Sequence, residues 1–137
     1  MNKNTIKAPC TVILAAANII VFLGLSFFGM TENTGFMLEH GAMYVPYIVG
    51  RGEYYRLFTS MFLHFGYDHL FNNMIVLGTM GWVLESEIGK IKFLIIYFVS
   101  GLAGNLLSLW MQIQTGDLAV SAGASGAIFG VIGALLY

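Results

Sequence analysis

A serine set among glycines opens the last apolar segment of the chain, in the stretch Ser121-Ala-Gly-Ala-Ser-Gly-Ala-Ile-Phe-Gly130. A serine hydroxyl acts as a nucleophile when a base takes its proton, and acyl transfer also needs hydrogen-bond donors directed at the developing oxyanion. The same pattern is typical of small residues that pack between membrane helices. The spacing around Ser125 therefore leaves both interpretations open.

Two further polar residues, His69 and Asn73, lie near the start of the second apolar segment. Because they are four residues apart, they project from one face of a helix, one above the other. Strongly polar side chains are costly within a membrane span, and they usually face the protein interior or a water-filled cavity. The pair predicts a polar pocket, with interhelical hydrogen bonding by the same two side chains as the alternative.

The residues able to bind a metal are few and poorly spaced. His64 and His69 are five residues apart, and no Asp or Glu joins them at helical spacing. The lone Cys10 excludes an intramolecular disulfide and a thiolate metal cluster. We therefore expect neither a metal nor a cofactor.

The composition is that of an integral membrane protein in a lipid bilayer. Hydrophobic residues make up 58% of the chain and charged residues only 9%, whereas about a quarter of the residues in soluble domains are charged. Six Lys and Arg against seven Asp and Glu leave the chain nearly neutral. It therefore lacks the basic surface that nucleic-acid binding would need.

Hydropathy predicts an all-α, polytopic protein whose elements must position these side chains. The expected spans are residues 11–29, 69–84, 93–111 and 124–137, and Asp68 is the expected N-cap of the second. Residues 30–68 form a long extracytoplasmic loop, and connections of this length are usually functional or folded. Its aromatic part, residues 53–64, is expected to be a short helix at the membrane interface.

The last span is too short to cross a bilayer. It offers about 13 residues, or ~20 Å of helix at 1.5 Å per residue, against a hydrocarbon thickness of ~30 Å. We therefore expect a single membrane domain that is truncated within its fourth helix, the N-terminal part of a longer membrane protein.

Small residues recur along the third and fourth spans at three- and four-residue spacing. The third span carries a small and polar stripe, and the fourth a ridge of small residues: Gly101, Gly104, Asn105, Ser108 and Gln112, then Gly126, Gly130 and Ala134. Such residues let membrane helices approach closely and hydrogen-bond across the contact. We therefore expect each of these two spans to pack closely against a neighbouring helix in the membrane.

Charged residues set the orientation of the chain. Lys3 and Lys7 precede the first span, and Lys90 and Lys92 follow the second. The positive-inside rule then predicts a cytoplasmic N-terminus. The second and fourth spans both begin at the outer face in this topology.

The topology brings the polar residues to a common depth. His69 and Asn73 lie in the first turns of the second span, and Ser125 lies in the first turn of the fourth. Backbone N–H groups in that first turn lack intrahelical partners, and the helix dipole favours negative charge there. Gly123 and Gly126 leave the surroundings of Ser125 bare, so that a substrate backbone can come close.

At these residues the chain resembles the rhomboid family of intramembrane serine proteases. The matching motifs cover roughly residues 50–137: Gly123-Ala-Ser-Gly126, His69-Leu-Phe-Asn-Asn73-Met, Tyr54-Tyr-Arg-Leu-Phe-Thr-Ser-Met-Phe-Leu-His64, Glu85, and Gly101-Leu-Ala-Gly-Asn105. The resemblance implies a helical bundle with a six-helix core, of which about four helices are present here. It implies a serine that attacks a peptide bond in a transmembrane segment of a substrate protein, in a water-filled cavity near the outer leaflet.

The resemblance also implies a role for individual residues. By position, Ser125 would be the nucleophile, His69 and Asn73 would help form the oxyanion hole, and Arg56 and Glu85 would be structural. The general base of the family is a histidine on the sixth helix, beyond residue 137, so this fragment alone should be inactive. From the residues alone His69 could also be the base, but the resemblance argues against that role.

Two rival functions remain at this point. A non-catalytic relative would use the same residues to pack helices or to bind client transmembrane segments. Half of a transporter or channel is a weaker rival, because broken helices and midplane charges have no counterpart in these spans. The compact N-terminus and the lack of a transit peptide favour a bacterial plasma membrane. The protease interpretation places the active site toward its extracytoplasmic side.

Overall fold

Helices account for nearly all the regular structure of residues 7–137, the part of the chain that the computed structural model describes. The helices are α1 (Pro9–Ser26), α2 (Thr34–Glu39), α3 (Val45–Arg51), α4 (Arg56–Thr59), α5 (Gly66–Val76), α6 (Trp82–Ile88), α7 (Lys90–Thr115) and α8 (Ser125–Leu136). A 3₁₀ turn (Ser60–Phe62) follows α4, and a π-helical turn (Leu77–Gly81) joins α5 to α6. The predicted all-α class is confirmed. The orientation signal of Lys3 lies outside the described residues.

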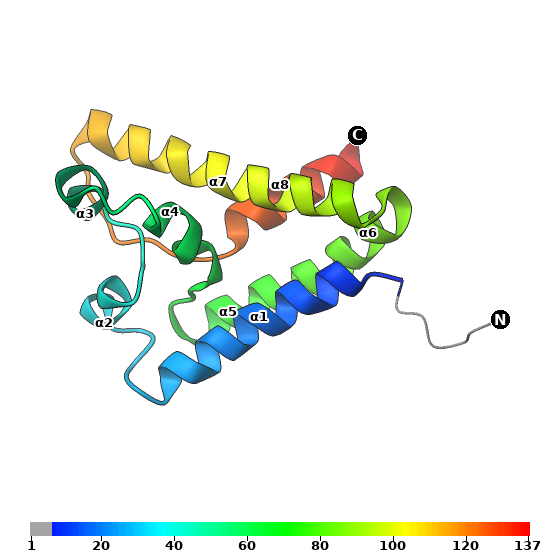
Figure 1. The fold of residues 1–137 in the computed structure, drawn as a ribbon, viewed down its shortest axis with the longest axis horizontal. Coiled ribbons are helices and arrows are strands. Elements are labelled where there is room, and N and C mark those ends of the chain that lie inside the picture. Colours follow the sequence, from blue (N-terminus) through cyan, green and yellow to red (C-terminus); the bar gives the residue numbers. More distant parts are fainter. Residues whose placement is uncertain (1–6) are drawn as a thin grey trace.

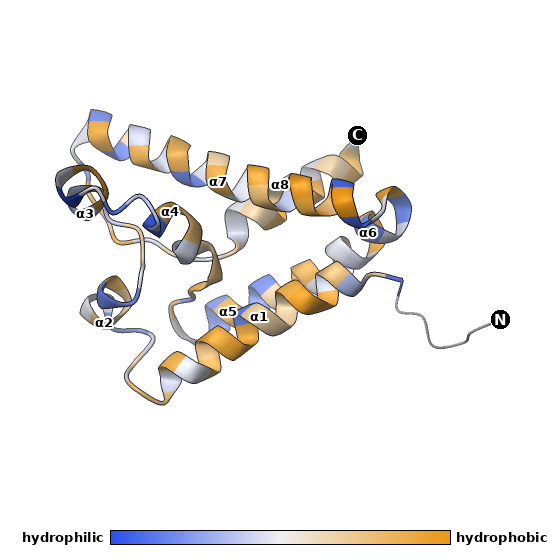
Figure 2. Ribbon diagram, in the orientation of Figure 1, coloured by the Kyte–Doolittle hydropathy of each residue, from blue (hydrophilic) through white to orange (hydrophobic). Residues whose placement is uncertain are grey.

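Different helices form the two ends of the bundle. Figure 1 shows α2, α3 and α4 gathered at one end, and the start of α1, α6 and the end of α8 at the other. Figure 2 shows apolar residues along much of α1 and α7, and mixed apolar and polar residues in α3 and α6. Both α1 and α7 are long and apolar enough to cross a membrane. The core between the long helices is built from large apolar side chains, among them Leu14, Leu77, Leu84, Phe93, Tyr97 and Val131.

Helix α1 begins two residues before the predicted apolar run because its first turn is capped from another helix. Pro9 occupies the first helical position, where its missing N–H is harmless. The Glu85 carboxylate of α6 accepts hydrogen bonds from Cys10 N at 2.9 Å, Thr11 N at 2.7 Å and the Thr11 hydroxyl at 2.8 Å. A buried carboxylate thus satisfies the free N–H groups at the positive end of the helix dipole.

The second predicted span is one continuous helical stretch over residues 66–88, with a π-helical turn in its middle. The predicted N-cap role of Asp68 is wrong, because the helix already starts at Gly66 and Asp68 lies within its first turn. At that position the negative charge of its side chain still interacts favourably with the helix dipole. Gly66 adopts a positive φ of 79°, which a glycine allows without strain and which redirects the chain into the helix.

Helices α7 and α8 approach closely through the predicted small residues. A Cβ added to Gly104 would lie 3.7 Å from the Gly126 Cα, and one added to Gly126 would lie 3.8 Å from the Gly101 Cα. A Cβ at Gly130 would overlap the Ser100 side chain. Helix α7 also extends beyond the predicted apolar range at both ends, since its polar termini continue the helix as far as Gly89 and Gly116.

The long loop of residues 30–68 is folded, and its centre is Arg56. Arg56 is only 4% exposed. Nη1 donates to the carbonyls of Leu38 at 2.6 Å and Ala42 at 2.8 Å, and Nε donates to Glu53 at 2.9 Å. The single interfacial helix predicted over residues 53–64 is instead the short α4 followed by the 3₁₀ turn, because the chain bends to place Arg56 inside.

Candidate active site

The turn that leads into Ser125 is held by the backbone of the long loop. Met43 and Ser121 form an antiparallel bridge, with Met43 N donating to Ser121 O at 2.8 Å and Ser121 N donating to Met43 O at 2.9 Å. Two residues later, Gly123 N donates to the Ser60 carbonyl at 2.8 Å. The loop therefore acts as a scaffold for the residues that precede the predicted nucleophile.

This scaffold is itself tied to α7. The Asn105 side chain donates from Nδ2 to the Leu57 carbonyl at 2.7 Å and to the Ser60 hydroxyl at 3.1 Å. Asn105 was part of the predicted polar stripe, and its amide fixes the 3₁₀ turn whose carbonyl holds Gly123. The stripe thus contributes to the site as well as to helix packing.

The structure brings His69 and Asn73 to the serine turn, where they meet it at Gly123. A Cβ added to Gly123 would lie 2.7 Å from His69 Cε1, 2.9 Å from His69 Nε2 and 3.6 Å from Asn73 Nδ2. Gly123 also has a φ of 128°, a conformation that L side chains rarely adopt. Only glycine therefore allows the turn and the imidazole to lie so close together.

The hydrogen bond made by His69 defines which ring nitrogen carries the proton. Nδ1 of His69 accepts from the Phe65 N–H at 3.4 Å. In the neutral ring the proton must then be on Nε2, the nitrogen that lies beside Gly123. His69 therefore presents a donor to the serine turn, as an oxyanion contact requires.

Asn73 presents a second donor. Its Nδ2 atom is buried and has no hydrogen-bond partner within residues 7–137. An unpaired buried N–H group is costly, and such groups are often explained by a functional role. The amide is free to donate to an oxygen that approaches the Gly123 turn.

Ser125 itself is the first residue of α8 and is partly exposed. Ala124, the N-cap residue, provides no side-chain cap, so the first backbone N–H groups of α8 remain available to a ligand. Over residues 7–137, the Ser125 hydroxyl makes no hydrogen bond to a histidine or carboxylate. The described part of the chain holds the serine and the donors without a paired base.

His64 also belongs to this site. From the sequence it was considered only as a metal ligand together with His69, and that role was disfavoured. It is 1% exposed, and its Nε2 accepts from Ala124 N at 3.3 Å. Its ring packs edge-on against His69, with the ring centroids 5.0 Å apart. Burial and the nearby His69 lower the pKa of His64 to about 4. In the sequence, His64 stood out only as the last residue of the motif Tyr54 to His64 and by its place five residues before His69.

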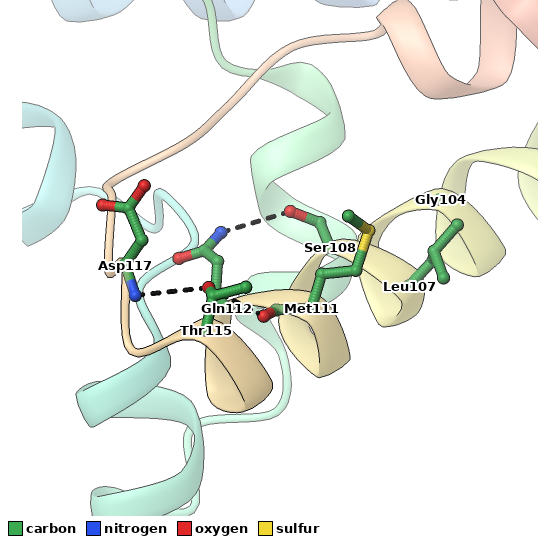
Figure 3. Close-up of a pocket in the computed structure, with 7 residues that line it drawn as sticks. All are labelled: Gly104, Leu107, Ser108, Met111, Gln112, Thr115 and Asp117. Atoms are coloured by element: carbon green, nitrogen blue, oxygen red, sulfur yellow. Dashed lines mark hydrogen bonds between the residues drawn. The ribbon is translucent and has the colours of Figure 1, made fainter.

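A separate pocket lies along the C-terminal half of α7 and the chain that follows it (Figure 3). Its lining residues are Gly104, Leu107, Ser108, Met111, Gln112, Thr115 and Asp117. Gln112 donates to the Ser108 hydroxyl at 3.2 Å and accepts from Ala119 N at 3.0 Å. The polar groups of this pocket therefore support the α7–α8 connection, which leads to the serine turn.

Comparison with known proteins places this site in a family. Residues 51–137 match the model of the rhomboid domain, and this range contains the serine turn and the histidine and asparagine of α5. Rhomboid protease GluP of Bacillus subtilis is 37% identical, over 96% of this chain and 25% of that protein. RHOMBOID-like protein 1 of Arabidopsis thaliana is 39% identical, over 84% of this chain and 30% of that protein.

A third relative, Rhomboid-like protease 3 of Toxoplasma gondii, is 40% identical over 69% of this chain and 34% of its own length. The chain thus spans between a quarter and about a third of the length of these curated relatives. The match covers the motifs that the sequence analysis singled out, and the apolar helices fit a membrane location. The chain belongs to the rhomboid family of integral membrane proteins.

Proposed function

We propose that the full-length protein is an intramembrane serine protease that hydrolyses peptide bonds in or near the transmembrane segments of other membrane proteins. The observation that carries the proposal is the buried Nδ2 of Asn73, which lies beside the turn that leads into Ser125 and has no hydrogen-bond partner in the described part of the chain. If Asn73 only packed helices, its N–H group would be expected to have a hydrogen-bond partner. A reaction that develops negative charge on an oxygen atom instead needs a free donor of this kind. A relative named as a protease, 37% identical, supports the same function.

In the proposed reaction Ser125 Oγ attacks the carbonyl carbon of the scissile peptide. The Oγ–C bond forms, the proton of the hydroxyl passes to a general base, and the carbonyl oxygen becomes an oxyanion. When the intermediate collapses, the C–N bond breaks and the base returns a proton to the leaving amine. Water then hydrolyses the acyl-enzyme by the same steps.

The oxyanion is stabilised by donors that come from two helices. Asn73 Nδ2 and the Nε2–H of His69 contribute side-chain donors from α5, and the Ser125 N–H contributes a backbone donor at the start of α8. Each such donor is worth about 10²- to 10³-fold in rate in serine proteases. No cofactor or metal takes part in the proposed reaction.

The general base is proposed to be a histidine outside residues 1–137. His69 is a poor candidate, because its Nδ1 accepts from Phe65 N and its Nε2 carries the proton in the neutral ring. A base needs an unprotonated nitrogen directed at the hydroxyl. On this proposal residues 1–137 alone have no protease activity.

The membrane orientation follows from the same arrangement. The Ser125 turn is bonded to the loop of residues 30–68, whose helices lie at one end of the bundle, and Lys90 and Lys92 follow α6 at the other (Figure 1). We place the lysines and the N-terminus in the cytoplasm and the serine toward the extracytoplasmic side. The similarity to a Bacillus subtilis protein over 96% of the chain supports a bacterial plasma membrane.

The test is cleavage of a transmembrane substrate by the purified full-length protein in liposomes. We expect Ser125→Ala to abolish cleavage. Ser86→Ala is the matched control, because Ser86 lies exposed on α6 and, within residues 7–137, its hydroxyl donates only to the Trp82 carbonyl. This variant should cleave as the wild type does. If the wild type binds such segments but cleaves none of them, the protein is a non-catalytic member of the family.

A further inference from the structure

We propose that His64 is a positioning residue of this site: its Nε2 holds the Ala124 N–H and so fixes the backbone from which the Ser125 hydroxyl projects. The inference rests on the proposed role of Ser125 as the nucleophile. It concerns a contact one residue away from the reacting atom, so His64 acts through the turn and does not touch the substrate.

The contact between the ring and the turn is specific. His64 is buried, and the Ala124 N–H at 3.3 Å from Nε2 is its one hydrogen-bond partner within residues 7–137, where Nδ1 has none. The His69 ring packs against it at 5.0 Å between centroids. A buried imidazole with a single bond to the residue before a predicted nucleophile is placed to orient that residue.

The turn needs such a contact because Gly123 is conformationally free. The Ser60 carbonyl holds the N–H of Gly123 itself, but the next peptide plane, which carries the Ala124 N–H, follows the ψ of a glycine. Rotation of that plane would carry Ser125 with it. Among residues 7–137, it is the bond from Ala124 N to His64 that restrains this plane.

The bond also fixes the charge of the ring. Nε2 accepts a hydrogen bond, so it carries no proton, and an imidazolium, which donates from both nitrogens, could not make this contact. The low pKa of His64, about 4, keeps the ring neutral near pH 7. The titratable group that faces it from the described elements is His69 of α5.

Two substitutions of His64 in the full-length protein separate positioning from packing. Glutamine can place an acceptor oxygen near the position of Nε2, whereas leucine fills a similar volume without an acceptor. We expect His64→Leu to lower kcat about 10- to 100-fold, the range for a misplaced catalytic group, with KM unchanged. His64→Gln should keep most of the wild-type kcat. His40→Leu is the control, because His40 is exposed and, among the described residues, its ring hydrogen-bonds the Phe36 carbonyl and packs on the Phe36 ring, away from the serine turn.

Two results would overturn the inference. One is His64→Leu with the kcat of the wild type; the other is a folded His64→Gln that loses as much kcat as His64→Leu. Neither result touches the proposed function, which fails separately if Ser125→Ala still cleaves.

A second measurement does not depend on activity or on the folding of a variant. Hydrogen exchange in the wild-type protein should show the Ala124 amide protected in micelles near neutral pH. An Ala124 amide that exchanges as fast as in an unstructured peptide would refute the contact.

Discussion

Replacing Gly123 by alanine tests the closest approach in the proposed site. The added Cβ would lie 2.7 Å from His69 Cε1 and 2.9 Å from its Nε2, distances that force the ring to move away. The residue would also have to hold a φ of 128°, and such strained backbone costs about 1–3 kcal/mol. The substitution therefore acts on both the stability of the turn and the position of His69.

The two effects have separate magnitudes. Displacing His69 removes one of the proposed oxyanion donors, which should lower kcat by about 10²- to 10³-fold. The strain lowers the free energy of unfolding by about 1–3 kcal/mol. Gly133→Ala is the matched control on α8, because nothing lies within 4 Å of a Cβ there and alanine is favoured over glycine in a helix by about 1 kcal/mol.

The assay is steady-state cleavage of a fluorogenic transmembrane substrate by the full-length protein, with unfolding measured in mixed micelles. We expect Gly133→Ala to keep the wild-type kcat. In a His69→Ala background the added methyl group has no ring to displace, so Gly123→Ala should then cost much less in kcat. Wild-type kcat in Gly123→Ala, or an undiminished loss in that background, would refute the proposed contact with His69.

Three further predictions test other parts of the structure. Asn73→Leu removes the unpaired donor, so kcat should fall about 10²-fold while stability stays the same or rises; a large loss of stability would argue for a packing role. Glu85→Gln weakens the charged cap of α1 and should lower the free energy of unfolding by about 1–3 kcal/mol, whereas Glu87→Gln, on the exposed face of α6, should leave it unchanged. The pKa of His64 lies below its usual value, so the unfolded state binds the extra proton between about pH 6.5 and 4. Stability should therefore fall across this window as the pH decreases, by up to about 3 kcal/mol, and His64→Gln should reduce this dependence.

Hydropathy and helical spacing predicted much of the fold. The apolar runs located α1, α7 and α8 because a membrane span must be long and apolar. Their ends were harder to predict, since they depend on contacts between distant residues. Glu85 caps α1 from another helix, and Asp68 lost its predicted cap role because the helix starts earlier, at Gly66.

The site was predictable where topology alone fixed it. His69 and Asn73 are one helical turn apart, and placing two helices in the same direction was enough to bring them to the serine turn. Met43, Ser60 and His64 could not be found in this way. They belong to an irregular loop, and its path follows from the burial of Arg56 and from backbone hydrogen bonds that leave no periodic pattern in the sequence.

The most direct test of the central claim is to identify the residue that reacts with a serine-directed fluorophosphonate. The full-length protein in liposomes would be labelled, digested and analysed by mass spectrometry. We expect a single adduct on Ser125, absent in Ser125→Ala and retained in Ser86→Ala. An adduct on another residue, or equal labelling of the Ser125→Ala protein, would contradict the assignment of Ser125 as the nucleophile.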